Sequence, residues 1–581
     1  MKAGLILAIA FLAFGVAAKT PAADIPDPRS RVYVAPVRVV WDSGRSADGL
    51  AAVVRSDALV TQKHGQVPEG GWVQGSVGVP PCALDNAGAP AGVLLDFGRE
   101  LHGGVQILTG RGTGRHLRMR VRFGESVAEA MSSVGEKGAT NDHAIRDDVI
   151  AVPWFGSREV GSTGFRFVRI DLVTQGRLVL EAVRAVALER PMTRVGRFRC
   201  SDERLNRIYE TAVRTVHLCC QDYLWDGIKR DRLVWMGDTH PETMGVLCAF
   251  GAQRILPDSL DFMAATTPPD AWMNGMPTYT LWWIRNLAEW YRFTGDTAYL
   301  RKHHQYLKDT FRHVVSGMQG GQWMAGNFLD WPTRGNNEAA TAGTQGLALI
   351  TARETEFLAE EIGAEELAVS ARKMASELAR LRPDPHGAKP AAALLGLSGL
   401  ADPKVMYEQV LSRNGEDGVS TFYGYYMLEA MSAAGQDQRA LDTVRDYWGA
   451  MLDMGATSFW EDFSVAWTNG AFRIDELPVA GKKDIHGDFG AYCYKGFRHS
   501  LCHGWSCGPA PWLMAHVLGV RPIGVGCRTV EVKPFLGDLE WAEGDYPTPF
   551  GVVHVRAEKR AAGTMDVRIT APDGVRVQRV K

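Results

Sequence analysis

Residues 201–218 read SDERLNRIYETAVRTVHL, and they mark the point at which the periodicity of the chain changes. Ser201 or Asp202 can serve as the N-cap of a helix that starts here. The apolar residues that follow recur at helical spacing, and they are Leu205, Ile208, Tyr209, Ala212, Val213 and Val216. Because nearly every strong pattern from here to about residue 520 is helical, the stretch predicts the start of a large helical domain.

The helical segments come in pairs. Residues 280–295 and 297–318 are two such segments, and a short turn containing Gly and Asp joins them. Short turns of this kind are typical of αα-hairpins. The pairs show no repeat of fixed length, which disfavours a solenoid of tetratricopeptide type. Residues 196–520 therefore predict a ring of helical hairpins, an (α/α)6 barrel.

β-rich blocks lie on both sides of the helical domain. Residues 19–195 contain short, β-branched and often alternating runs separated by Gly, Asp, Asn and Pro, a pattern typical of a β-sandwich. Strand patterns return in residues 521–581. The predicted fold class is a multidomain α plus β protein with an N-terminal β-sandwich, a central (α/α)6 barrel and a small C-terminal β-sandwich.

Residues 1–18 read MKAGLILAIAFLAFGVAA. One lysine precedes an apolar run that is shorter than a membrane span and ends in small residues, which predicts a cleaved signal peptide. We therefore expect a periplasmic or secreted protein. No later segment has the length and apolar character of a membrane span, so we expect no stable membrane insertion.

Composition excludes one class of partner and favours another. Lys and Arg total 64 against 66 Asp and Glu, and the chain has no basic run, so we expect no nucleic-acid partner. The 17 tryptophans provide flat apolar walls with a polar N–H, which suit sugars. The nine cysteines do not reveal their pairing. His499, Cys502, His503 and Cys507 match no standard metal-binding spacing, so we expect no metal site.

Residues 226–238, DGIKRDRLVWMGD, concentrate the candidate chemistry. The sequence lacks the phosphate-binding, dinucleotide-binding, nucleophile-elbow and zinc-protease motifs. Carboxylates and aromatic residues in loops between helices remain, and two carboxylates on opposite sides of a sugar are what glycoside hydrolysis requires. The candidates are Asp226, Arg230, Asp231, Trp235, Asp238, Trp272, Asp330, Trp331, Trp460, Glu461, His503 and Trp505.

Structural roles are the alternative interpretation of several candidates. The Arg-Asp-Arg cluster at 230–232 can be an ion network. Thr239 and Glu242 fit a capping box at a helix start. His503 can be a core histidine, and Trp272 and Trp331 can be packing residues.

The chain resembles the α-L-rhamnosidases of glycoside hydrolase family 78, which belong to the six-hairpin glycosidases. The resemblance rests on residues 226–238, on TSFWE at 457–461 and on SLCHGW at 500–505. In the first motif, the residues that fall in register with the family pattern are Asp226, Arg230, Trp235, Gly237 and Asp238.

The resemblance implies hydrolysis of terminal α-linked L-rhamnose with inversion and without a cofactor. It assigns the general base to Glu461. It implies that the sugar ring is held by Asp226, Arg230, Trp235, Asp238 and His503. The expected partner is a rhamnose-containing oligosaccharide, polysaccharide or glycoside.

One position departs from the family pattern. The general acid of the family is a glutamate that follows the motif arginine, and here Asp231 stands in its place. Its carboxyl group lies about 1.5 Å short on ordinary bond lengths. Either the backbone compensates, another carboxylate such as Glu242 donates the proton, or the protein has changed task.

The leading hypothesis is an exported inverting exo-glycosidase in which Asp231 donates the proton. For that role we expect Asp231 to be buried among indoles, with Arg230 and Arg232 facing away, and to lie roughly 6.5–9.5 Å from Glu461. A same-fold glycosidase for another sugar or linkage and a catalytically impaired carbohydrate-binding relative are the alternatives.

Overall fold

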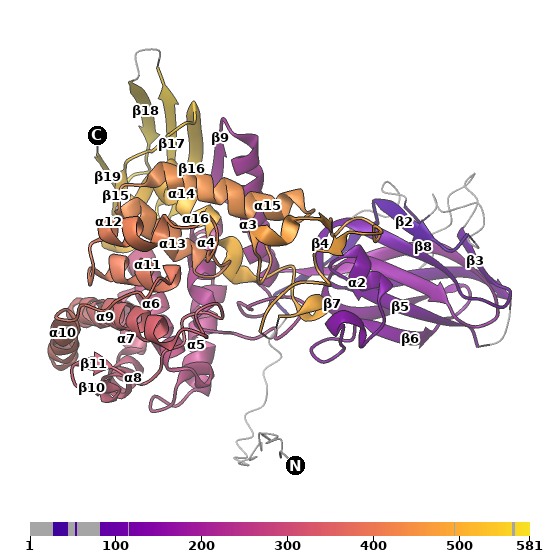
Figure 1. Ribbon diagram of the computed structural model, residues 1–581, viewed down its shortest axis with the longest axis horizontal. Helices are drawn as coiled ribbons and strands as arrows, with labels where there is room; N and C mark the ends of the chain where they lie inside the picture. The colour runs from indigo at the N-terminus through magenta and orange to yellow at the C-terminus, as the bar shows by residue number, and fades with distance from the viewer. Residues whose placement is uncertain are drawn as a thin grey trace.

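The computed structural model describes residues 27–44, 53–54, 82–113, 116–492, 494–560 and 564–580. The N-terminal sheet domain lies beside the helical domain, and the C-terminal sheets pack on another side of the helices (Figure 1). This arrangement confirms the predicted fold class of two sheet domains around a helical barrel. The predicted signal peptide, residues 1–18, lies outside the described residues, as does Cys493.

The N-terminal domain is built on an eight-stranded antiparallel sheet. Its strands are β1 (Ser30–Val34), β2 (Arg38–Asp42), β3 (Cys82–Asn86), β4 (Ala91–Thr113), β5 (Arg118–Gly124), β6 (Asp147–Ala151), β7 (Gly156–Leu172) and β8 (Gly176–Glu189). They run in the order β1-β8-β4-β7-β5-β6, with β2 added to β4 and β3 added to β8. A short helix, α2 (Val127–Met131), follows β5.

The long strand β4 gives this domain its core. Its pairing with β7 shifts in register between Asp96 and Leu101, and such an irregularity bends a strand. The first half pairs with β2 and the second half with β8. Apolar side chains from both halves, including Leu95 and Ile107, join one buried cluster.

The helical domain contains fourteen described α-helices. They are α3 (Glu203–Cys219), α4 (Thr239–Phe250), α5 (Ile255–Thr266), α6 (Pro277–Thr294), α7 (Thr297–Lys302), α8 (His304–Ser316), α9 (Asn337–Ile362), α10 (Glu365–Leu378), α11 (Lys389–Ser398), α12 (Pro403–Met406), α13 (Gly424–Ala433), α14 (Asp437–Thr443), α15 (Gly449–Asp453) and α16 (Pro509–Trp512). π-Helical turns continue α12, α14 and α16. Two small strand pairs, β10 (Met318–Gln319) with β11 (Gln322–Trp323) and β12 (Ala471–Phe472) with β13 (Lys483–Asp484), lie in the connecting loops.

Six helices close an inner ring. Contacts run from α4 through α6, α9, α11 and α13 to α16, and α16 contacts α4 again. The sequence explains which helices lie inside. α4 buries every residue except Met244, as an inner helix must, whereas α8 buries one stripe through Leu307, Phe311 and Val314. The predicted closure of the helical hairpins is confirmed.

Helix α3 begins as the sequence predicts. The Asp202 carboxylate is the N-cap and accepts hydrogen bonds from the backbone N–H groups of Arg204, at 2.8 Å, and Leu205, at 3.4 Å. The apolar stripe of residues 205–216 is buried.

The C-terminal domain consists of two small sheets. One contains β14 (Val520–Pro522), β15 (Thr529–Val532) and β19 (Arg576–Arg579), and the other contains β16 (Trp541–Thr548), β17 (Gly551–Lys559), β18 (Met565–Thr570) and β9 (Arg197–Cys200). β9 lies within the range predicted as barrel, yet it pairs with β16. The link between the first two domains is therefore part of the C-terminal sheet.

Two further predictions concern membranes and cysteines. Within the described part of the chain, no helix combines the length and apolar character needed to cross a bilayer. The eight described cysteines are all buried, and none of them forms a disulfide.

A buried ion network joins the N-terminal domain to the barrel loops. The Lys229 ammonium lies 2.9 Å from Glu129 Oε1 and 3.3 Å from Glu125 Oε2, and all three side chains are buried. Lys229 also donates to the carbonyl of His499 at 2.8 Å. Glu125 accepts from the backbone N–H of Leu501. One cation therefore connects three separate segments of the chain.

Removing this cation should weaken the fold. In Lys229→Met two buried carboxylates lose their shared partner, and we expect the free energy of unfolding to fall by about 3 kcal/mol. Urea unfolding measures the change. The control is Lys308→Met, which breaks a 2.7 Å ion pair with the exposed Glu366 and should leave stability unchanged. Equal midpoints for the two variants would contradict the role of the network.

Candidate active site

The 226–238 stretch forms a loop closed on itself and on residues 503–504. The Asp226 backbone N–H donates to Leu233 O at 3.0 Å, and Asp226 Oδ1 accepts from Leu233 N–H at 2.9 Å. Gly504 N–H donates to Asp226 O at 2.7 Å, and Gly227 pairs with His503 in an isolated β-bridge. Two of the three predicted motifs are therefore brought together by backbone hydrogen bonds.

Three predicted site residues meet around the imidazole of a fourth, His503. His503 Nε2 lies 3.7 Å from Asp226 Oδ2, 3.9 Å from Asp238 Oδ2 and 3.7 Å from Glu461 Oε1. All four side chains are buried. The distances exceed those of direct hydrogen bonds, so none of the three pairs is directly hydrogen-bonded.

Burial decides the protonation of this cluster. Burial, together with the like charges of the neighbouring carboxylates, raises the pKa of Asp226 and of Asp238 well above the usual range. Burial raises the pKa of Glu461 to about 7, although Arg230 opposes the shift. Burial also lowers the pKa of His503 well below its usual range, so the imidazole is neutral and can donate or accept a hydrogen bond.

Fixed donors orient two of the carboxylates. Tyr279 O–H donates to Asp238 Oδ1 at 2.8 Å, and Ser500 N–H donates to Glu461 Oε2 at 3.0 Å. The other oxygen of each carboxylate faces His503. Asp238 occupies the N-cap position of α4, but its side chain makes no capping hydrogen bond there. The carboxylates are therefore aimed at the centre of the cluster.

The same cluster offers ligand atoms to a cation. Ligand atoms of Asp226, Asp238 and His503 lie within 4.8 Å of one another. Closed structural zinc sites use four ligands, and these oxygens suit sugar hydroxyls equally well. A second group, Glu125, Glu129 and His486, also has the spacing of a metal site. There the Lys229 ammonium already lies between the carboxylates.

Asp231 lies at a sharp turn next to this cluster. Asp231 and Arg232 both adopt left-handed backbone angles, with φ of 51° and 56°. Arg230 Nη2 lies 3.4 Å from Asp231 Oδ1, whereas Arg232 turns away and donates to Ser162 O at 2.9 Å. Only Arg232 therefore faces away as expected. The Asp231 side chain is 21% exposed instead of enclosed by indoles.

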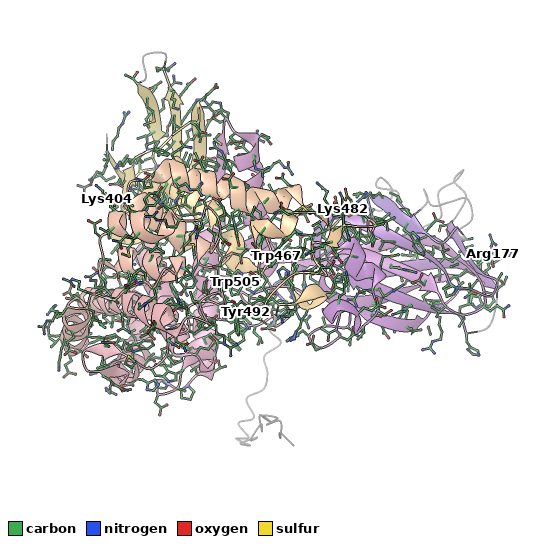
Figure 2. The ribbon with its side chains drawn as sticks, in the orientation of Figure 1. Arg177, Lys404, Trp467, Lys482, Tyr492 and Trp505 are labelled. Carbon is green, nitrogen blue, oxygen red and sulfur yellow. The ribbon has the colours of Figure 1, made fainter. Side chains whose placement is uncertain are left out.

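Aromatic side chains extend from the cluster towards the surface. Trp505 Nε1 donates to Glu461 O at 3.0 Å, and its ring lies 4.0 Å from that of His503. Trp331 contacts Tyr494 at 5.8 Å and Tyr492 at 6.1 Å between ring centroids. Trp505 and Tyr492 both lie where the barrel faces the N-terminal domain (Figure 2). The predicted roles of Trp505 and Trp331 in sugar binding stay predictions.

Trp235 also lies beside the cluster, and two other predicted tryptophans have packing contacts. Trp235 packs edge-on against Tyr279, the partner of Asp238. Trp460 is fully buried, and its ring packs edge-on against Phe463. Trp272 lies 3.9 Å from the His313 ring and packs on Trp323. Trp460 and Trp272 thus have packing contacts, and their predicted roles in sugar binding stay predictions.

Asp330 stabilises its own loop. Its Oδ1 accepts from Thr333 Oγ1 at 2.6 Å, and its Oδ2 accepts from Ser420 Oγ at 2.9 Å. Both carboxylate oxygens therefore have protein partners, and the Trp331 loop is tied to residue 420.

Glu242 does not form the capping box that the sequence suggests. Helix α4 begins one residue after Asp238, and neither carboxylate oxygen of Glu242 has a hydrogen-bond partner among the described residues. The side chain is completely buried beneath Gly504, where an added Cβ would lie 1.8 Å from Oε1. Burial raises the pKa of Glu242 well above the usual range, and Asp238 and Asp226 add to the shift. Burial therefore favours the protonated form of this carboxyl group.

Sequence reasoning missed three partners of the site. Tyr279 contacts Asp238, and His143 contacts Asp231. Lys229 contacts the 499–501 segment. Tyr279 and His143 lie far from the motifs in sequence and belong to no motif. Lys229 lies inside the first motif, but its two carboxylate partners belong to the N-terminal domain.

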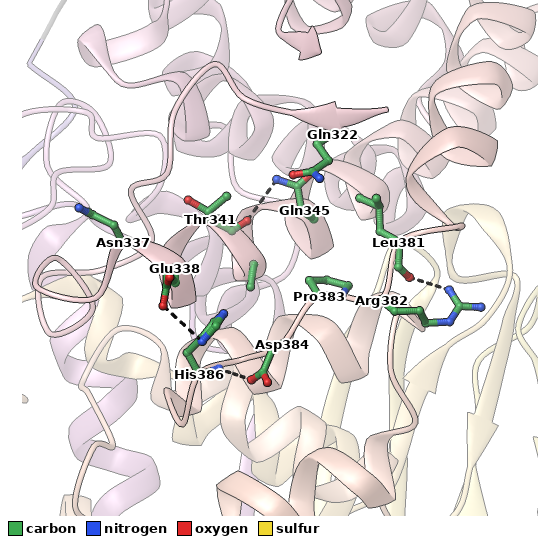
Figure 3. Close-up of a pocket in the computed structure, with 11 residues that line it drawn as sticks. Gln322, Asn337, Glu338, Thr341, Gln345, Leu381, Arg382, Pro383, Asp384 and His386 are labelled. Carbon is green, nitrogen blue, oxygen red and sulfur yellow. Dashed lines mark hydrogen bonds and ion pairs between the residues drawn. The ribbon is translucent and has the colours of Figure 1, made fainter. Parts of the chain in front are cut away.

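A surface pocket of about 440 Å³ lies elsewhere, at the start of α9 (Figure 3). Thr341, Gln345, Asp384 and His386 are among its lining residues. None of the predicted site residues lines it, so it is separate from the acidic cluster.

Two segments of the chain match models of known domains. Residues 193–379 match the model of the bacterial alpha-L-rhamnosidase six-hairpin glycosidase domain, and residues 519–580 match that of the bacterial alpha-L-rhamnosidase C-terminal domain. The two matched segments are therefore similar to domains of bacterial α-L-rhamnosidases. No curated protein matches it.

Solved rhamnosidases share this fold. A glycoside hydrolase family 78 rhamnosidase of Bacillus sp. GL1 is 24% identical with a TM-score of 0.72, over 91% of this chain and 56% of that chain. The Klebsiella oxytoca rhamnosidase with rhamnose bound is 20% identical with a TM-score of 0.61, over 84% of this chain and 96% of that chain. The Streptomyces avermitilis α-L-rhamnosidase complexed with L-rhamnose is 17% identical with a TM-score of 0.63, over 84% and 48%. The match spans little more than half of the Bacillus chain.

Substitution of Glu242 should change how stability depends on pH. The folded protein keeps a proton on Glu242 that the unfolded chain releases above about pH 4.3, so this group lowers the free energy of unfolding as pH rises. Glu242→Gln has no carboxyl group at this position, so its free energy of unfolding does not fall with pH for this reason. We expect the melting temperature of the variant, relative to wild type, to rise between about pH 5 and about pH 8, with a limit of about 1.4 kcal/mol per pH unit.

Thermal melts across this pH range measure the difference. Glu338→Gln, at a site where the side chain is 79% exposed, is the control and should follow wild type. A Glu242→Gln difference that stays constant with pH would show that this carboxyl group is ionised in the folded protein.

Proposed function

We propose that this protein is an inverting exo-glycosidase that releases terminal α-linked L-rhamnose from a glycan or glycoside. The observation that carries the proposal is the convergence of Asp226, Asp238 and Glu461 on His503 in a buried site beside Asp231. Carboxylates on two sides of a sugar supply the acid and the base of glycoside hydrolysis. The domains of the chain and the rhamnose complexes of structurally similar proteins support rhamnose as the sugar.

Glu461 is the general base in this proposal. Ser500 fixes one carboxylate oxygen, which leaves the other facing the cluster and able to take a proton from water. Because burial raises its pKa to about 7, Glu461 holds a proton strongly enough to be an effective base near neutral pH. Asp226 and Asp238 bind the sugar hydroxyls, and the neutral His503 lies between them.

Asp231 is the proposed general acid. It lies next to Arg230, whose Nη2 is 3.4 Å from Asp231 Oδ1. Its shorter side chain requires the loop to carry the carboxyl group towards the leaving oxygen. The left-handed turn at Asp231 and Arg232 is the local feature that can do this.

The substitution at 231 also favours a second candidate, a carbohydrate-binding relative with impaired catalysis. Assays on an aryl α-L-rhamnoside and on a glycan array separate the two candidates. Release of rhamnose supports the enzyme, whereas binding without release supports the binding protein. Export remains a prediction that rests on residues 1–18.

The pH dependence of kcat/KM should reflect the ionisation of Glu461. The base must be ionised, so kcat/KM should fall as pH drops below the pKa of about 7. Glu461→Gln should fold normally and lose several orders of magnitude in turnover on an aryl α-L-rhamnoside. Near-normal turnover in the variant would exclude Glu461 as the base.

The effect of substituting Asp231 should depend on the leaving group of the substrate. Asp231→Asn removes the proton donor, so hydrolysis of a natural glycan should slow far more than hydrolysis of an activated aryl rhamnoside, which leaves unaided. Asp231→Glu restores a donor of the length found in the family and should retain activity on both substrates. Equal slowing of both substrates by Asp231→Asn would assign the proton to another group.

A further inference from the structure

A histidine of the N-terminal domain contacts the proposed acid. The Asp231 backbone N–H donates to His143 Nδ1 at 3.2 Å, and Asp231 Oδ1 lies 3.5 Å from the same nitrogen. His143 precedes β6 and so belongs to the sheet domain, not to the barrel. The position of Asp231 therefore depends on a residue from another domain.

The surroundings of His143 support Nδ1 as an acceptor. A neutral imidazole carries one N–H, so it accepts at only one of its nitrogens. Arg498 Nη2 lies 3.2 Å from Nε2, but Arg498 also has the Asp142 carboxylate at 3.2 Å. With the proton on Nε2, Nδ1 accepts from Asp231 while Arg498 keeps an acceptor in Asp142. The protonated Nε2 then lies 3.7 Å from Asp142 Oδ2.

The turn at 231–232 needs such contacts. Residues other than glycine in left-handed conformations cost about 1–3 kcal/mol each and persist only where neighbouring groups hold them. Arg232 donates to Ser162 O and to His143 O, so the N-terminal domain holds both residues of the turn. One residue is held through its side chain and the other through its backbone.

We propose that His143 is a positioning residue for Asp231, so that the N-terminal domain completes the active site. This inference rests on the proposed function. Aspartate is one methylene shorter than the family glutamate, so its carboxyl group reaches the leaving oxygen only if the backbone is held in place. A misplacement of about 1 Å can cost roughly a hundredfold in rate, which gives the contact its functional weight.

Two substitutions separate the two nitrogens of His143. His143→Asn keeps a polar atom near the position of Nδ1 and loses the atom that faces Arg498. His143→Gln places its amide near the position of Nε2 and loses the acceptor for Asp231. Both side chains are polar, and thermal melts confirm that each variant folds. His116→Gln is the matched control, because His116 is exposed in the same domain.

The readout is the ratio of kcat/KM for a poor leaving group to that for an activated aryl α-L-rhamnoside. We expect His143→Gln to lower kcat/KM on the poor leaving group about tenfold to a hundredfold with little change on the aryl substrate. His143→Asn should retain most of the wild-type ratio, and His116→Gln should equal wild type. If His143 had a purely structural role, its substitution would lower kcat/KM on both substrates together.

Other outcomes overturn the inference. The Nδ1 contact does not position the acid if His143→Gln slows the hydrolysis of both substrates equally or of neither. The same conclusion follows if His143→Asn is the variant that loses activity on the poor leaving group. In both cases the proposed function stands. If the wild-type chain releases no rhamnose from either substrate, the proposed function fails and takes this inference with it.

Discussion

The buried ammonium of Lys229 is the interaction on which the arrangement of the active site depends. A buried charge is costly unless it has partners. Lys229 pairs with Glu125 and Glu129 of the N-terminal domain, and it donates to the His499 carbonyl on a barrel loop. Burial raises the pKa of Glu125 to about 7, against the opposing effect of Lys229. A network of this kind gives little net stability, but it fixes which segments lie together.

The segments that Lys229 fixes are those that carry the proposed chemistry. Lys229 is adjacent to Arg230 and Asp231 in the first motif, and its carbonyl partner is adjacent to Ser500, whose N–H holds Glu461. The network thus ties the loops that carry Asp231 and Glu461 to the N-terminal domain. The N-terminal domain is in this account a structural part of the catalytic centre, and His143 extends the same principle to Asp231.

Periodicity predicted the fold because burial acts locally along each element. The stripe of residues 205–216 and the nearly complete burial of α4 express the same rule, and the inner ring follows from it. Motifs correctly grouped Asp226, Asp238, Glu461 and His503. Patterns alone do not show whether Trp460 and Trp272 bind sugar or only pack. They also missed Tyr279 and His143, because contacts between distant segments leave no signal in local spacing.

The central claim is that Glu461 activates water on the face of rhamnose opposite to the leaving group. The most direct measurement is proton NMR of the first product that the wild-type chain releases from an aryl α-L-rhamnoside, taken before mutarotation. Direct attack by water inverts the anomeric centre, so the account predicts that β-L-rhamnose forms first. Initial release of α-L-rhamnose would show a covalent intermediate and would contradict the assignment of Glu461 as a base for water.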